Sequence, residues 1–180
     1  MRLEIDSEAY LRLLEFNDAE CIFDLVDHNR AYLSEWLPWV SSTKTVEDTQ
    51  SFLEHVEANH ASKRAIHCGI IVQDRLVGLI GLRFSDGDYV VNIGYWLSAH
   101  VSGRGLMTRA VQQLCSHAFK QLNVERIEIR AATDNPRSWS IANRLGFTRE
   151  GVLRRCERVS DRFLDHYMYS LLRTDDVDWR

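Results

Sequence analysis

The chain has 180 residues, with 22 basic and 26 acidic side chains, so its formal net charge is −4 with histidine neutral. Hydrophobic residues make up 45% and charged residues 27%, a mix that excludes collagen-like, low-complexity and disordered chains. A chain of this length is expected to form one domain, residues 1–180, around one hydrophobic core. The acidic balance argues against a nucleic-acid partner bound through its phosphates.

The N-terminal segment and the cysteines indicate a cytoplasmic protein. The first 18 residues carry charges throughout and lack the apolar core of a signal peptide. No apolar run approaches the roughly 20 residues of a membrane span, so no membrane partner is expected. The scattered cysteines and histidines form no CxxC pair and no HExxH motif, which favours reduced thiols and no metal site. The cysteines are Cys21, Cys68, Cys115 and Cys156.

Capping residues predict the starts of two helices, which follow a short strand expected over residues 10–14. In both places a side-chain acceptor is followed three positions later by an acidic residue, the pattern of a capping box. Between the two helices, the aromatic-rich segment 31–39 should be interrupted by Pro38. The capping pairs are Asn17 with Glu20 and Thr45 with Asp48.

The pattern changes to strands near residue 65. Residues 66–72, 76–82 and 89–97 are rich in β-branched and aromatic side chains and are separated by turn residues, at 73–75 and at Asp86–Gly87. They predict an antiparallel meander. The expected order of elements, β-α-α-β-β-β-α-β-α-β-β, indicates one α/β domain with a mixed sheet. The later elements are a helix over 106–118, a strand over 125–131, a helix over 138–145 and strands over 147–157 and 163–172.

Two glycines, Gly103 and Gly105, stand between a strand ending Gly94-Tyr-Trp-Leu97 and a helix. Glycines let backbone N–H groups approach a ligand, and a helix start adds unpaired donors and a positive dipole end, so the segment suits a pyrophosphate. A tight turn alone would also explain the glycines. The segment lacks the GxGxxG spacing of dinucleotide folds and the GK[ST] of P-loops.

A second segment, residues 134–147, points to the same end of the sheet. Pro136 fits the first turn of a helix, Asn135 its cap and Gly146 its end. Asn135 and Ser138 would then face the glycine loop. Simple capping explains Asn135, but it does not explain both segments in this order.

In this order and with these motifs, the chain resembles the GNAT superfamily of N-acetyltransferases. Within it the chain is most similar to the RimJ/RimL type, which acetylates the N-terminal residue of ribosomal proteins. Segments 30–39, 150–154 and 165–173 share in the resemblance. It implies a single α/β (α+β) domain whose mostly antiparallel mixed sheet is flanked by helices. The strand ending at Leu97 and the strand over 126–131 would splay apart to form the acetyl-CoA cleft.

The resemblance also implies how acetyl-CoA is held. Its pantetheine would pair with backbone near residues 96–98 and with Asn135, and its pyrophosphate would lie on the amides of residues 103–108. Ser102 stands where the superfamily has Gln or Arg, which leaves one phosphate contact open, whereas Met107 is common in the subgroup. The implied contacts are Trp96, Leu97, Ser98, Gly103, Arg104, Gly105, Leu106, Met107, Thr108, Asn135 and Ser138.

Acetyl transfer from a thioester to an amine needs a neutral amine, a donor for the oxyanion and a proton for the departing thiolate. A free α-amine has a pKa of roughly 7.7–8.0, so a weak base is enough and no protein nucleophile is required. We expect Ser138 to serve the thiolate, although it could simply lie in a helix turn. Following the resemblance, Glu157 is the expected base, unless it only pairs with Arg155 or Arg158. The backbone N–H of Leu97 would serve the oxyanion.

The acceptor groove is expected along the aromatic segment, although its aromatic residues could instead belong to the core. Asp165 matches a residue of the subgroup or fixes the last hairpin. Cys115 and His117 lie two apart on a helix and face different sides, which argues against a Cys/His pair. The expected acceptor contacts are Asn29, Tyr32, Glu35, Trp36 and Trp39.

These expectations favour an acetyl-CoA-dependent N-acetyltransferase acting on the N-terminal α-amine of a ribosomal or other protein. One alternative is a small acceptor such as a polyamine, an amino sugar or an amino-acid conjugate. Another is a non-catalytic acyl-CoA-binding module. An acidic groove would suit basic protein tails and polyamines alike, and a homodimer is left open.

Overall fold

The computed structural model describes residues 1–85, 89–177 and 179, so the turn expected at Asp86–Gly87 lies outside the described residues. Within these residues, eight strands form one sheet in the order β1-β2-β3-β4-β5-β6-β8-β7. Each described neighbouring pair is antiparallel except β5 and β6, which are parallel, and this confirms the mixed, mostly antiparallel sheet. The strands are β1 (Arg2–Glu4), β2 (Ala9–Leu13), β3 (Ala65–Val72), β4 (Arg75–Phe84), β5 (Val90–Leu97), β6 (Arg126–Ala132), β7 (Thr148–Val159) and β8 (Arg162–Leu172).

The meander β3-β4-β5 follows from its local sequence. Gln73 and Asp74 form a two-residue turn in which both residues have a left-handed backbone conformation, with φ of 47° and 59°. The twist of such a turn matches the twist of the two strands that it joins. Successive side chains of β4 then point to opposite faces of the sheet, Leu79 into one hydrophobic core and Ile80 into another. The sheet therefore needs helices on both faces.

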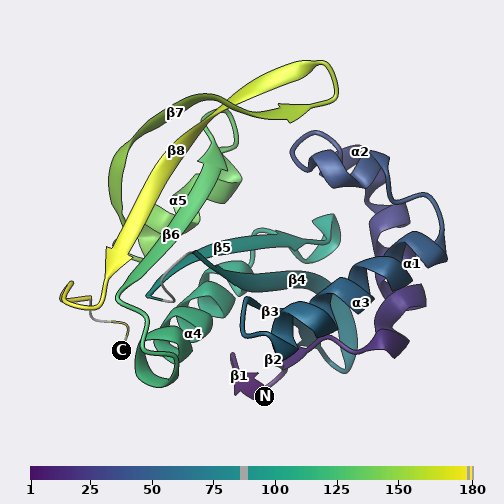
Figure 1. Cartoon of the computed structure of the whole chain (residues 1–180), viewed down its shortest axis with the longest axis horizontal. Helices are drawn as coiled ribbons and strands as arrows, with labels where there is room; N and C mark the ends of the chain where they lie inside the picture. Colours follow the sequence, from purple (N-terminus) through teal and green to yellow (C-terminus); the bar gives the residue numbers. More distant parts are fainter. Residues whose placement is uncertain (86–88, 178, 180) are drawn as a thin grey trace.

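The described part of the chain contains five α-helices, and they cover the two faces of the sheet. Leu114 of α4 packs in the core with Ile80, while Val26 of α1 and Leu53 of α3 pack in the core with Leu79. Figure 1 shows α1, α2 and α3 gathered at one side of the molecule and α4 and α5 at the other. The helices are α1 (Ala19–His28), α2 (Arg30–Leu33), α3 (Val46–Ala61), α4 (Leu106–Gln121) and α5 (Pro136–Arg144), with short 3-10 turns at Phe16–Asp18, Pro38–Ser41 and Ala99–Val101.

One of the two predicted capping boxes is correct. Thr45 accepts the backbone N–H of Asp48, whose carboxylate accepts the N–H of Thr45 at 2.9 Å, at the start of α3. The prediction that Asn17 caps the first helix is wrong, because a 3-10 turn intervenes and α1 begins at Ala19. Asp18 is the residue that precedes α1. Its carboxylate pairs with Arg12 of β2 at 2.6 Å and accepts the backbone N–H of Glu15.

The sheet opens between β5 and β6. The two strands pair from Val90 with Arg126 to Ile93 with Ile129 and no further. Beyond that point β5 stays with β4, whereas β6 stays with β8, so the expected splay is present. In Figure 1 the β7–β8 hairpin bends over this opening towards α2. The chain just after α2 meets it there, since Arg162 Nη2 donates to the carbonyl of Glu35 at 3.1 Å.

Candidate active site

A cavity of about 1540 Å³ lies in the opening between β5 and β6. Its wall is built from β3, β4, β5 and β6, the helices α1, α2, α3 and α5, the segment between α2 and α3, the start of α4, and the β7–β8 hairpin. Most of the residues expected at the site belong to this wall. They are Tyr32, Trp36, Trp39, Trp96, Leu97, Gly103, Gly105, Leu106, Met107, Thr108, Asn135, Ser138 and Glu157.

One end of the cavity is the glycine loop before α4. Gly103 and Gly105 have φ of 82° and 71°, the left-handed region that favours glycine. Gly105 is the residue that caps α4, and a Cβ built on Gly103 would meet no atom within 4 Å. The first N–H groups of α4 have no acceptor within the helix and sit at its positive dipole end. These residues fit an anionic group such as a pyrophosphate.

A positive charge that the sequence analysis missed lies beside this loop. Arg144, in the last turn of α5, donates from Nη2 to Thr108 Oγ1 at 3.2 Å and from Nη1 to Ser140 Oγ at 3.1 Å. It lines the cavity, whereas Arg104 does not. In the sequence, a basic residue before Gly146 reads as an ordinary helix ending, which is why Arg144 gave no separate signal.

Ser138 meets β5 across the cavity wall. Asn135 Oδ1 accepts the N–H of Ser138 at 3.2 Å, the cap expected from the sequence. Tyr95 donates its hydroxyl to the carbonyl of Ser138 at 3.1 Å, and Ser138 Oγ lies 3.4 Å from the Tyr95 oxygen. Burial raises the pKa of Tyr95 to about 12, so this hydroxyl keeps its proton near neutral pH. Tyr95 belongs to the Gly94-Tyr-Trp-Leu97 motif, but the motif by itself gives this side chain no role at the site.

The chain after β5 is held by Asn29. Asn29 Oδ1 accepts the Ser98 hydroxyl at 3.1 Å and the N–H of Ala99 at 3.0 Å. Ser98 is fully buried, and neither it nor Asn29 belongs to the cavity wall. Asn29 was expected to contact the acceptor, but its side-chain oxygen is used in holding this turn.

The backbone of β5 leaves the amide of Leu97 free of β4. Ser98 donates its N–H to the carbonyl of Val77 on β4 at 2.8 Å. Because N–H groups alternate between the two sides of a strand, the amide of Leu97 points away from β4 and towards the opening. The amide of Ser98 is therefore not available to a ligand in the cleft.

Aromatic side chains line the other end of the cavity. Trp39 is 37% exposed and lies 6.2 Å, centroid to centroid, from Trp96. Trp36 also packs against the small core at the end of the β7–β8 hairpin, which includes Leu164. Glu35 does not line the cavity; its carbonyl instead accepts Arg162.

Glu157 lies against a histidine. Its Oε2 is 3.4 Å from Nε2 of His166 on β8, and both residues line the cavity. The two arginines considered as partners are placed elsewhere: Arg158 contacts Asp161 at 3.8 Å, and Arg155 lies over the Phe163 ring. No motif in the sequence marks His166, because it meets Glu157 only through the pairing of two strands.

A bulge in β7 brings Glu157 to this position. Register shifts so that β7 advances from Leu153 to Glu157 while β8 advances only from His166 to Leu164. Arg155 within the bulge has φ 48°, and its N–H donates to Asp165 Oδ1 at 2.7 Å. Of the two readings of Asp165, the structure supports the one in which it fixes the last hairpin.

The cysteines differ in their surroundings: Cys156 is exposed and lines the cavity, whereas Cys68 and Cys115 do not line it. Cys68 and Cys115 are buried, and burial raises the pKa of both thiols, that of Cys68 to about 12. Within residues 1–85, 89–177 and 179, no group of three or more His, Cys, Asp and Glu side chains could hold a metal ion. None of the described helices is both long and apolar enough to cross a membrane.

Comparison with known proteins decides the family. The family profile described as "Acetyltransferase (GNAT) domain" matches residues 9–148. The chain belongs to the GNAT acetyltransferase family. It is an acetyl-CoA-dependent acetyltransferase, and the glycine loop with the start of α4 fits the anionic part of that donor.

Relatives of this GNAT acetyltransferase cover nearly the whole chain. It is 29% identical over 174 residues to a putative ribosomal N-acetyltransferase, YdaF, of Bacillus subtilis, covering 96% of this chain and 95% of that protein. It is 27% identical to the ribosomal-protein-serine acetyltransferase of Escherichia coli, covering 93% and 94%.

Solved structures share its fold. One is RimL, a ribosomal L7/L12 alpha-N-protein acetyltransferase, in complex with coenzyme A, with a TM-score of 0.92, 24% identity and coverage of 96% and 98%. Another is the microcin C7 self-immunity acetyltransferase MccE in complex with acetyl-CoA and AMP, with a TM-score of 0.89, 25% identity and coverage of 93% and 94%. The likeness to RimL confirms the expected fold class.

Proposed function

We propose that this enzyme acetylates the N-terminal α-amine of a protein or peptide. The observation that carries the proposal is one continuous cavity, with the glycine loop at one end and Glu157 among aromatic side chains at the other. Its volume of about 1540 Å³ exceeds the roughly 300–1,000 Å³ of ordinary small-molecule pockets. It leaves room for a length of peptide beside the donor. The ribosomal-protein acetyltransferases among its relatives support the same acceptor.

The donor end has four kinds of contact to offer. The amides at the start of α4, with Arg144 beside them, would bind the pyrophosphate. Asn135 would bond the pantetheine arm. Acetyl-CoA supplies the activated thioester, and the amide of Leu97, which faces the opening, would stabilise the oxyanion. Ser138 would donate a proton or hydrogen bond to the departing thiolate, with Tyr95 holding its position.

At the acceptor end, Glu157 would remove the proton that makes the amine unreactive. An α-amine has a pKa of roughly 7.7–8.0, so at neutral pH a weak base within reach of it is sufficient. Glu157 lines the cavity, and its side chain is 37% exposed, so solvent can take up the proton after each turnover.

The charges on the wall argue against a polyamine acceptor. A polyamine would favour an acidic groove, but the described ionisable residues of the cavity wall do not form one. Two carboxylates stand against four arginines and three histidines. They are Asp48, Glu157, Arg83, Arg130, Arg137, Arg144, His55, His67 and His166. A compound with several positive charges would gain little there.

The test is acetyl-CoA turnover by the purified enzyme with a panel of peptides and small amines. We expect free-thiol release with unblocked peptides, and mass spectrometry should locate the acetyl group on the α-nitrogen. Peptides with a blocked N-terminus but an internal lysine are the matched control and should be inactive. Turnover stimulated only by small amines would contradict the proposed acceptor.

A further inference from the structure

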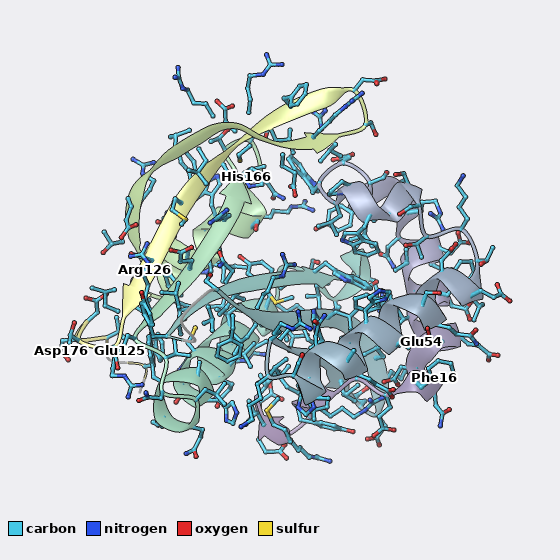
Figure 2. The ribbon with its side chains drawn as sticks, viewed as in Figure 1. Phe16, Glu54, Glu125, Arg126, His166 and Asp176 are labelled. Carbon is cyan, nitrogen blue, oxygen red and sulfur yellow. The ribbon has the colours of Figure 1, made fainter. Side chains whose placement is uncertain are left out.

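His166 is a buried imidazole that the reaction described so far does not use. It lies on β8, within the hairpin that bends over the opening (Figure 2), and is 9% exposed. Its Nε2 is buried and has no hydrogen-bond partner among the described residues. Since a buried polar atom without a partner is costly, this arrangement calls for a reason.

The carboxylate of Glu157 lies beside this atom. Its Oε2 lies 3.4 Å from Nε2, close enough for attraction but misaligned for a hydrogen bond. The Glu157 side chain is 37% exposed and that of His166 11%, so the carboxylate is open to solvent while the imidazole is buried beside it. A small rotation of either side chain would complete the bond.

The surroundings keep the imidazole neutral. Burial lowers the pKa of His166, and Arg130 on β6 lowers it further, while the carboxylates of Glu157, Asp134 and Asp165 act in the opposite direction. A neutral imidazole carries one N–H, and with that hydrogen on Nε2 it can donate to Glu157.

We propose that His166 is a positioning residue, whose Nε2–H holds one oxygen of the Glu157 carboxylate so that the other faces the acceptor amine. The inference rests on the proposed role of Glu157 as the base. An N–H bond of the acceptor ammonium breaks, and its proton passes to Oε1 of Glu157, leaving the electron pair on nitrogen. His166 keeps its own proton, and Glu157 releases the captured one to solvent.

Two variants of His166 separate positioning from direct proton transfer. His166→Leu removes the donor, and we expect kcat to fall on the order of 10- to 100-fold with KM for acetyl-CoA unchanged. His166→Gln can place an amide N–H near the position of Nε2, so it should keep kcat within a few-fold of the wild type. Equal losses in both variants would overturn the proposal, since glutamine can donate but cannot act as a base.

A double-mutant cycle tests whether His166 acts through Glu157. In the Glu157→Gln background, His166→Leu should cost little beyond the loss already caused by Glu157→Gln. If it costs its full factor again, His166 does not work through Glu157. His60→Gln, on the exposed end of α3, is the matched control and should leave kcat unchanged. Thermal unfolding and coenzyme A binding of each variant check that it is folded.

A proton titration of the His166 ring by NMR gives a readout that needs no acceptor. Because Glu157 raises the pKa of His166, Glu157→Gln should lower it. An unchanged pKa would overturn the proposal even if the variants lose activity. If the pKa falls but no unblocked peptide is acetylated by the wild type, the acceptor proposal fails while the pairing stands. If His166→Leu does not fold, His166→Gln and the titration decide.

Discussion

The side chain of Tyr95 links β5 to the start of α5. Its hydroxyl, buried and held neutral, reaches from β5 to the first turn of α5, where Ser138 lies. The backbone N–H of Ser138 donates to the Asn135 cap, whereas its hydroxyl forms a hydrogen bond with no described side chain except Tyr95. The hydroxyl can therefore be removed without dismantling the helix start.

Ser138→Ala should lower kcat by about 100-fold, the low end of the range for a lost proton donor, because the thiolate would leave unassisted. Steady-state thiol release with an unblocked peptide measures this. Coenzyme A binding by calorimetry should change little. Tyr95→Phe is the informative comparison: it leaves the Ser138 hydroxyl in place, so its loss should be smaller. Full turnover in Ser138→Ala would remove this residue from the mechanism.

At the scale of the elements, the loop that precedes α4 depends on left-handed backbone conformations, which favour glycine. Gly105 caps the helix at φ 71°, and a Cβ on it would stand 3.2 Å from Arg109 Nη1. Arg109 in turn holds the carbonyl of Arg104 and the carboxylate of Asp6. The loop is thus tied to the turn between β1 and β2 at the far edge of the sheet.

Gly105→Ala should weaken acetyl-CoA binding and destabilise the fold, since a left-handed conformation costs an L-residue roughly 1–2 kcal/mol. Calorimetric titration with acetyl-CoA and urea unfolding measure the two effects. Gly151→Ala is a matched control, because its added Cβ would meet no atom within 4 Å. Equal acetyl-CoA affinity in both variants would contradict the assigned role of the loop.

The edge of the sheet formed by β6, β8 and β7 is held by a charged cluster. Arg126 on β6 pairs with Glu150 on β7 at 2.6 Å, and the Ser170 hydroxyl on β8 donates to the same carboxylate at 2.7 Å. Arg126, and to a lesser degree Ser170, lower the pKa of Glu150 to about 2. Figure 2 labels Arg126 at this edge.

The depressed pKa of Glu150 predicts a pH-dependent contribution to stability. In the unfolded chain this carboxyl has the ordinary glutamate pKa of 4.5, whereas in the folded protein its pKa is about 2. Its contribution is therefore fully present above about pH 4.5 and lost as the pH falls towards 2. Urea unfolding of the wild type and Glu150→Gln should give a larger difference at pH 7 than at pH 2.5. An equal difference at both would mean that the ion pair does not contribute.

At the scale of the whole molecule, the site lies between parts that are far apart in the chain. The helices α1, α2 and α3 belong to the N-terminal part, whereas the β7–β8 hairpin belongs to the C-terminal part, and the hairpin bends towards α2 (Figure 1). Both parts contribute residues to the cavity wall. Arg162 and the carbonyl of Glu35 form a hydrogen bond between these two parts. We therefore expect this hydrogen bond to affect how the acceptor enters the cavity.

Arg162→Ala should raise KM for the acceptor peptide a few-fold, because a single hydrogen bond contributes about 1 kcal/mol, and should leave KM for acetyl-CoA unchanged. Arg158→Ala is the matched control, since its contacts, with Ser160 and Asp161, are local to the hairpin. Steady-state kinetics with each substrate varied in turn distinguishes the two. A change in KM for acetyl-CoA instead would place the effect at the other end of the cavity.

The features that the sequence determined by itself are those whose partners are close in the chain. The turn at Gln73–Asp74 and the Thr45 and Asn135 caps depend on residues within a few positions of one another. The glycine loop belongs with them, because its conformation and the start of α4 both follow from local residues. The wrong prediction of a cap at Asn17 shows the limit of such local reasoning, since Arg12 on the preceding strand β2 forms an ion pair with Asp18.

Only the tertiary structure decided which distant residues meet at the site. Asn29 holds the turn after β5 from 69 positions away, and Tyr95 reaches Ser138 across 43. Glu157 meets His166 because a bulge in β7 shifts the register of the hairpin. Such contacts depend on strand register and on helix packing, which arise from the burial of the two cores and not from neighbouring residues. For that reason the sequence determined the class of reaction, while the structure decided which side chains surround the site.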